Sequence, residues 1–180
     1  MRLSITRLMA YWVDFALAAF VLVGAQLLTY YATGGYPFDT FANGYEIERW
    51  VLLTMSLPVW VYFIAAEYFF SATIGKTIFK LAVFDANGGK PRLLQVIGRT
   101  FVKLLPWEMT HWIVLAPEPW WSIQQPENMN LIWIPNAMML VYIVSLFLAG
   151  GKRALHDFIA RTAAGQNDKN CKAAKTEASA

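Results

Sequence analysis

An aspartate lies in the middle of the first long apolar stretch of the chain. Asp14 falls within residues 8–28, and Arg7 precedes it by seven positions, so both side chains lie on one face of a helix. An ionised carboxylate at the centre of a bilayer costs about 2.5–3.5 kcal/mol in insertion assays. We therefore expect a membrane protein in which Asp14 faces protein, water or a cation.

Three further charged residues fall at comparable depth in later apolar stretches, namely Glu67, Arg99 and Lys103. A rise of 1.5 Å per residue places them and Asp14 between about 6 and 15 Å from one membrane surface. This polar layer is either an ion-pair network that fixes helix packing or a path for protons or cations. In both cases we predict that Asp14 lies within salt-bridge reach of Arg99, Lys103 or Arg7.

Several motifs resemble catalytic or metal sites, but each lacks a part that such a site requires. Residues 75–77 (Gly-Lys-Thr) match the end of a phosphate-binding loop, but Phe70 occupies the position of its first glycine and no strand precedes it. Glu108 and His111 have the spacing of a metal pair on one helix, yet the second such motif of a di-metal bundle is missing. The single Cys171 lies in a polar tail. We therefore expect no enzyme activity, no metal and no cofactor.

Four apolar stretches could carry these residues across a membrane, at about 5–31, 50–70, 93–116 and 131–149. Each approaches the roughly 20 residues that cross a hydrocarbon core. The third is the most polar, because Arg99, Lys103, Glu108 and His111 interrupt it and Pro106 bends it. A composition that is 57% hydrophobic and 15% charged agrees with a membrane chain. The predicted fold class is an all-α membrane protein with a bundle of four transmembrane helices.

The basic residues predict the orientation of this bundle. Of the 15 Lys and Arg residues, all except Arg49 lie in the N-terminus, between residues 71 and 103, or after residue 151. This bias places both termini and the 71–92 loop in the cytoplasm, and it requires that the third stretch spans. We assign the net charge of +3 to contact with anionic lipid at this face rather than to nucleic acid. A cleaved signal peptide is the competing interpretation, which Asp14 and the length of the stretch oppose.

The expected cytoplasmic segments are short. Residues 79–85 followed by Asn87-Gly88-Gly89 predict an extended or hairpin element. Residues 152–162 predict an amphipathic interfacial helix with a basic side. The polar residues 165–180 predict a disordered tail after a single domain at 1–164.

The order of these motifs resembles the RDD family of bacterial inner-membrane proteins, named for one arginine and two aspartates. Arg7 and Asp14 match its first two letters, and residues 73–76 match its T-x-G-K element. Arg99 fits the arginine that opens the next helix, and residues 154–157 with Thr162 fit the closing L-H-D…T element, which makes Asp157 the second aspartate. Lys80 departs from the family, which commonly has glycine there. The resemblance and the depth argument together give a supporting set: the resemblance contributes Thr73, Gly75, Lys76 and His156, and the depth argument contributes Glu67 and Lys103.

The resemblance implies two functions. Some members have been proposed to exchange monovalent cations for protons, in which case Asp14 would exchange the proton and Asp157 would lie at the cytoplasmic mouth. Four helices enclose little volume, so such a path would need a homo-oligomer. The alternative is a non-catalytic membrane assembly factor or subunit with a basic cytoplasmic docking face. A hydrated cavity at Asp14 would favour exchange, whereas a paired and buried Asp14 would suffice for the subunit.

Overall fold

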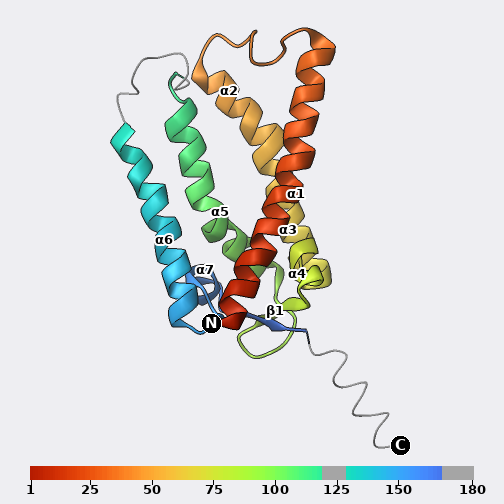
Figure 1. The fold of residues 1–180 in the computed structure, drawn as a ribbon, viewed down its shortest axis with the longest axis vertical. Helices are drawn as coiled ribbons and strands as arrows, with labels where there is room; N and C mark the ends of the chain where they lie inside the picture. Colours follow the sequence, from red (N-terminus) through yellow and green to blue (C-terminus); the bar gives the residue numbers. More distant parts are fainter. Residues whose placement is uncertain (119–128, 168–180) are drawn as a thin grey trace, which may run out of the picture.

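A computed structural model describes residues 1–118 and 129–167 of the chain. The elements, in chain order, are α1 (Arg2–Thr33), α2 (Gly44–Val51), the π-helix η1 (Leu52–Ser56), α3 (Leu57–Phe70), α4 (Ile74–Ile78), β1 (Leu81–Asp85), α5 (Leu93–Leu115), the 3₁₀-helix η2 (Met129–Ile132), α6 (Trp133–Leu148), α7 (Leu155–Ile159) and β2 (Thr162–Gln166). Long helices run side by side, and α4, α7 and the strands gather with the N-terminus at one end (Figure 1). We call this end the basal end, and the end at residues 34–43 the opposite end.

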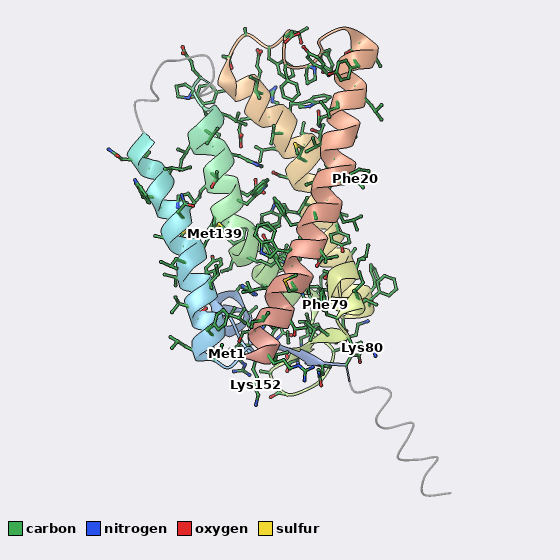
Figure 2. The ribbon with its side chains drawn as sticks, in the orientation of Figure 1. Met1, Phe20, Phe79, Lys80, Met139 and Lys152 are labelled. Carbon is green, nitrogen blue, oxygen red and sulfur yellow. The ribbon has the colours of Figure 1, made fainter. Side chains whose placement is uncertain are left out.

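Three helical segments are long and apolar enough to cross a membrane, and they comprise Arg2–Thr33, Gly44–Phe70 and Asn130–Leu148. Large apolar side chains cover their outer surfaces; Phe20, which lies well away from the basal end in Figure 2, is 81% exposed. The expectation of a mostly helical membrane protein is therefore confirmed. The segment α5 is comparable in length, with 23 residues, but Arg99, Lys103 and Glu108 make it more polar than the other three.

The second long segment is continuous from α2 through η1 to α3. The N–H of Leu57 binds the carbonyl of Leu52, which widens one turn of the helix at the residue before Pro58. Because proline has no N–H to donate, a π turn accommodates it without ending the helix. The helix that precedes Pro58 therefore continues to Phe70, where Ser71 ends it in the left-handed conformation.

The strands and α7 close the basal end. β1 pairs with β2 in an antiparallel register that runs from Leu81 opposite Gln166 to Asp85 opposite Thr162. The extended element predicted after Phe79 is therefore present, but its partner comes from the far end of the sequence. The turn after β1 is closed locally, where the N–H of Gly88 binds the carbonyl of Asp85 at 2.8 Å.

The amphipathic helix predicted over residues 152–162 is wrong in length and in orientation. α7 has only five residues, because Arg161 turns with a φ of 52° and the chain continues as β2. Both His156 and Asp157 are buried rather than exposed at an interface. Residues 165 and 166, which fall in the tail that we expected to be disordered, belong to the strand β2, because β1 offers them a partner edge. The predicted disorder of residues 168–180 lies outside the described part of the chain.

Candidate functional site: a buried polar network

Asp14 is enclosed by hydrogen-bond donors from two other elements. The hydroxyl of Tyr62 donates to Oδ1 at 2.7 Å, the backbone N–H of Gly75 donates to Oδ1 at 2.7 Å, and the hydroxyl of Thr73 donates to Oδ2 at 2.5 Å. The residue is only 2% exposed. A carboxylate that accepts several hydrogen bonds is stabilised in its ionised form even when it is buried.

The prediction that Asp14 pairs with a basic side chain is wrong. Within the described residues, the ion pairs closer than 4.0 Å involve Glu67 and Asp157 but not Asp14. Sequence reasoning placed the partners of Asp14 on other long helices. The structure instead brings the short helix α4 against α1, where its hydroxyl and backbone donors take the place of a cation.

A glycine at position 75 is required by this close approach. A Cβ atom on Gly75 would overlap the backbone oxygen of Ala10 and would lie 3.0 Å from the carboxyl carbon of Asp14. Thr73 also caps α4, since its Oγ1 accepts the N–H of Lys76 at 3.4 Å. The threonine and glycine therefore bring α4 onto α1 and complete the shell around Asp14.

Glu67 is a second buried acid, and it gathers three cations. Its Oε2 accepts the Nε–H of Arg99 at 2.8 Å, and its Oε1 contacts the ammonium groups of Lys76 and Lys103, the latter at 3.4 Å. The Lys103 ammonium also lies 3.4 Å from the centre of the Phe63 ring, a cation–π geometry. Glu67 is fully buried, so these partners are what allow it to remain ionised.

Asp157 is the third buried acid, and it joins the two ends of the sequence. The Arg7 Nη2 donates to its Oδ2 at 2.6 Å, and the Arg99 Nη1 forms an ion pair with its Oδ1. The N–H of Ala154 and the hydroxyl of Thr162 also donate to it, at 2.8 and 3.3 Å. Every part of this carboxylate is therefore engaged by α1, α5 or its own segment.

These contacts form one connected arrangement, which we call the basal network and which comprises Arg7, Asp14, Glu67, Lys76, Arg99, Lys103 and Asp157. Arg99 joins Glu67 to Asp157, and α4 joins Glu67 to Asp14 through the adjacent residues Lys76 and Gly75. The network thus links α1, α3, α4, α5 and α7. Chemically, it holds four cations against three acids in a region with little access to water.

Comparison with known proteins identifies the family of the chain. The model of the RDD family matches residues 4–161, which is most of the chain. The chain belongs to the RDD family. No curated protein and no solved structure matches it. Arg7, Asp14 and Asp157, which the sequence analysis matched to the letters of the family name, all lie in the basal network.

The structure therefore brings together the residues that the RDD resemblance singled out. Arg99 and Asp157 are in direct contact, and Lys76 and Lys103 both reach Glu67. The observed position of Asp157 differs from the predicted one, because the exchange hypothesis placed this residue at the cytoplasmic mouth. It lies instead in the centre of the network.

Burial lowers the pKa of two groups outside the long helices, namely Lys76 of the basal network and His156 beside it. Desolvation lowers the pKa of Lys76 to about 8, although the Glu67 carboxylate opposes that change. Desolvation, followed by the positive charge of Arg99, lowers the pKa of His156 well below its usual value. His156 is therefore neutral at pH 7, with its Nε2 3.6 Å from Asp157 Oδ2.

Sequence reasoning missed Tyr62 and Gly151 as parts of the site, and it named Thr162 only as a member of the closing family element. Nothing in the sequence separates Tyr62 from the other aromatic residues of its apolar stretch. The carbonyl of Gly151 accepts the Arg7 Nη1 at 2.9 Å, a contact that depends on the backbone path after α6. Thr162 carried a signal, since it belongs to the closing family element and here touches both Arg99 and Asp157.

Proposed function

We propose that this RDD-family protein is a non-catalytic subunit or assembly factor of the bacterial inner membrane, in which the basal network locks the helices together. The observation that carries the proposal is the enclosure of Asp14. Its carboxylate has three donors, is 2% exposed, and lines neither of the two described cavities. Exchange of cations for protons would need water or an ion at this carboxylate, so the enclosure favours the subunit.

The apolar cavity beside the network supports the same conclusion. It has a volume of about 210 Å³ and lies between α1, η1, α3 and α5, where its walls include Phe15, Ala19, Val59 and Leu104. Apolar cavities of this kind stay free of water. A route from Asp14 through this cavity would meet mostly apolar side chains.

In this proposal four segments span the membrane, with α5 as the fourth, and the basal end faces the cytoplasm. Apart from Arg49, the exposed basic residues of the described chain gather there, and they comprise Arg2, Lys80, Lys90, Arg92, Lys152 and Arg161. Lys80 and Lys152 lie at this end in Figure 2. Excess positive charge beside membrane helices is typical of the cytoplasmic side. This basic face would bind anionic lipid headgroups and position the protein within an assembly, including a homo-oligomer.

Proteoliposomes test the proposal. Purified protein is reconstituted with a pH-sensitive dye inside, and sodium or potassium is added across a pH gradient. We expect no cation-dependent proton flux from folded wild-type protein at any pH. A flux that Asp14→Asn abolishes would overturn the subunit proposal in favour of exchange.

Native gels of solubilised membranes test the docking face. We expect the wild type to migrate in an assembly larger than its 20.4 kDa chain. Charge reversal at the basal end, with Lys80→Glu, Lys90→Glu and Arg92→Glu combined, should shift it toward the monomer. Arg49→Glu is the matched control, because Arg49 is the exposed basic residue that lies toward the opposite end. Equal migration of both variants would argue against a docking role for the basal face.

A further inference from the structure

A second pair of acids, Glu48, which is buried, and Glu108, which is partly buried, lies away from the basal network, where α2 crosses α5. The crossing is tight because Gly44 packs onto the backbone of Leu115, and its N–H binds the carbonyl of Pro117 at 2.9 Å. Ile47, Val51 and Leu115 form the apolar contact between the two helices. Glu48 of α2 is buried beside this contact, and Glu108 lies two turns before Leu115 on α5. Both acids are therefore held on packed helices rather than on a loop.

Each of these acids has one oxygen without a partner. Glu48 is 2% exposed, and its Oε2 has no hydrogen bond within the described part of the chain. The Oε1 of Glu108 accepts the indole N–H of Trp60 at 2.8 Å, whereas its Oε2 is also without a partner there. Neither acid takes part in an ion pair among the described residues. The sequence from 104 to 128 contains no Lys or Arg that could supply one.

A cavity opens beside both carboxylates. It has a volume of about 320 Å³ and is lined by Glu48, Leu52, Glu108, Met109, Trp112 and Ile113. The volume falls at the lower end of the range of small-molecule sites, about 300–1,000 Å³. Trp112 is 53% exposed, so the cavity can be reached from outside the bundle.

The charges of this cavity are not compensated. Two carboxylates that face one low-dielectric space do not both stay ionised unless a positive charge joins them. Other titratable groups lie nearby: the Nδ1 of His111, one turn from Glu108, has no partner within the described residues, and the Tyr45 ring contacts that of Trp112. Arg49 follows Glu48 in the sequence, but it is exposed and forms no ion pair with either acid among these residues. No group of three or more His, Cys, Asp or Glu in those residues is arranged to hold a metal ion.

We propose that Glu48 and Glu108 form a binding site for an organic ammonium ion with an apolar body. The two carboxylates would neutralise the positive charge, and the indole face of Trp112 is suited to a weakly hydrated ammonium group through cation–π attraction. Leu52, Met109 and Ile113 would cover the apolar part of the ligand. This site goes beyond the proposed subunit role, since it shares no residue with the basal network.

Calorimetric titration of the full chain in lipid nanodiscs tests the site. The probe is benzyltrimethylammonium, which carries a permanent charge on an apolar body, and neopentylbenzene is its neutral counterpart of similar shape. We expect saturable binding of the cation and none of the neutral compound. Glu48→Gln and Glu108→Gln should each weaken binding by about tenfold or more, as loss of one member of a buried charge contact does. Glutamine keeps the size of the side chain and removes the charge.

Glu46→Gln is the matched control. Glu46 lies two residues from Glu48 on the same helix but is exposed, and its carboxylate accepts the N–H of Ala42, which glutamine can also do. We expect this variant to bind the probe as the wild type does. Any one of three results would overturn the site. The wild type does not bind the cation, it binds the neutral compound equally well, or both glutamine variants bind the cation as the wild type does. Complete displacement by sodium or potassium would assign the cavity to an inorganic ion and would also overturn it.

Discussion

Arg7 and Asp157, which are 150 positions apart in the sequence, form a buried ion pair with 2.6 Å between Nη2 and Oδ2. This contact ties the first turns of α1 to α7 and to the strand that follows. From the sequence, we matched these two residues to the arginine and to the second aspartate of the family name. The arginine and the second aspartate are partners, whereas the first aspartate is held separately by α4.

Removal of the Asp157 charge should strongly destabilise the protein. Asp157→Asn would leave Arg7 without an acid and Arg99 with Glu67 alone, and breaking a buried pair in this way costs about 3–5 kcal/mol. Denaturation in mild detergent, followed by circular dichroism, measures the change in the free energy of unfolding. Glu118→Gln, at an exposed position, should change it by less than about 0.5 kcal/mol. Equal effects of the two variants would contradict a structural role for the network.

Gly75→Ala should separate α4 from α1. The added methyl group would overlap the carbonyl of Ala10, and overpacking of this kind costs about 1–3 kcal/mol or more. Gly98→Ala is the control, because a Cβ at that helical position meets no atom within 4 Å. We expect the control to leave the melting temperature in detergent unchanged or slightly higher. A Gly75→Ala protein as stable as Gly98→Ala would show that the approach to Asp14 is not tight.

Asp14→Asn should destabilise the protein more than Glu118→Gln does. The asparagine amide would place N–H donors against the hydroxyl of Thr73 or the N–H of Gly75, which are themselves donors to the carboxylate. A buried donor without an acceptor costs about 1–3 kcal/mol. Thermal unfolding in detergent compares the two variants. Identical melting temperatures would mean that the donors around position 14 find other acceptors.

His156 should make stability fall as the pH falls. Its pKa is lowered in the folded protein, so the unfolded chain binds a proton first, and stability is lost below the unfolded value of about 6.5. The loss continues until the folded pKa is reached. The cations Arg99, Arg7 and Lys103 oppose protonation, while Glu67 and Asp157 favour it. The free energy of unfolding, measured between about pH 5 and 8, should change less steeply with pH for His156→Gln than for the wild type. An equal slope for both proteins would exclude His156 as the source of the pH dependence.

Reporter fusions should place the ends of α5 and α6 on opposite sides of the membrane. If α5 spans, a reporter after Ala116 reads periplasmic and one after Ala149 reads cytoplasmic, because most basic residues lie at the basal end. A cytoplasmic reading after Ala116 would show that α5 enters the membrane without crossing it. Arg99 and Lys103 would then approach Glu67 from a re-entrant segment.

The long helices and the identity of the charged residues could be predicted from the sequence. Apolar stretches of membrane length are read directly, because each backbone group of a helix is satisfied within its own segment. The cost of burying charge also predicted that Asp14, Glu67 and Arg99 would lie inside the protein. Glu48 escaped notice, because it stands just outside the second apolar stretch that we expected.

The choice of partner for each charge was decided only by the tertiary structure. Asp14 was expected to bind a cation, but it binds Thr73, Gly75 and Tyr62, since the position of α4 depends on how residues 71–80 fold back. β2 likewise forms only because β1 offers it an edge far earlier in the sequence; its last residue, Gln166, pairs with Leu81, which lies 85 positions before it. Composition and periodicity describe one segment at a time, whereas a hydrogen bond or ion pair between distant segments requires both to be placed within a few ångströms.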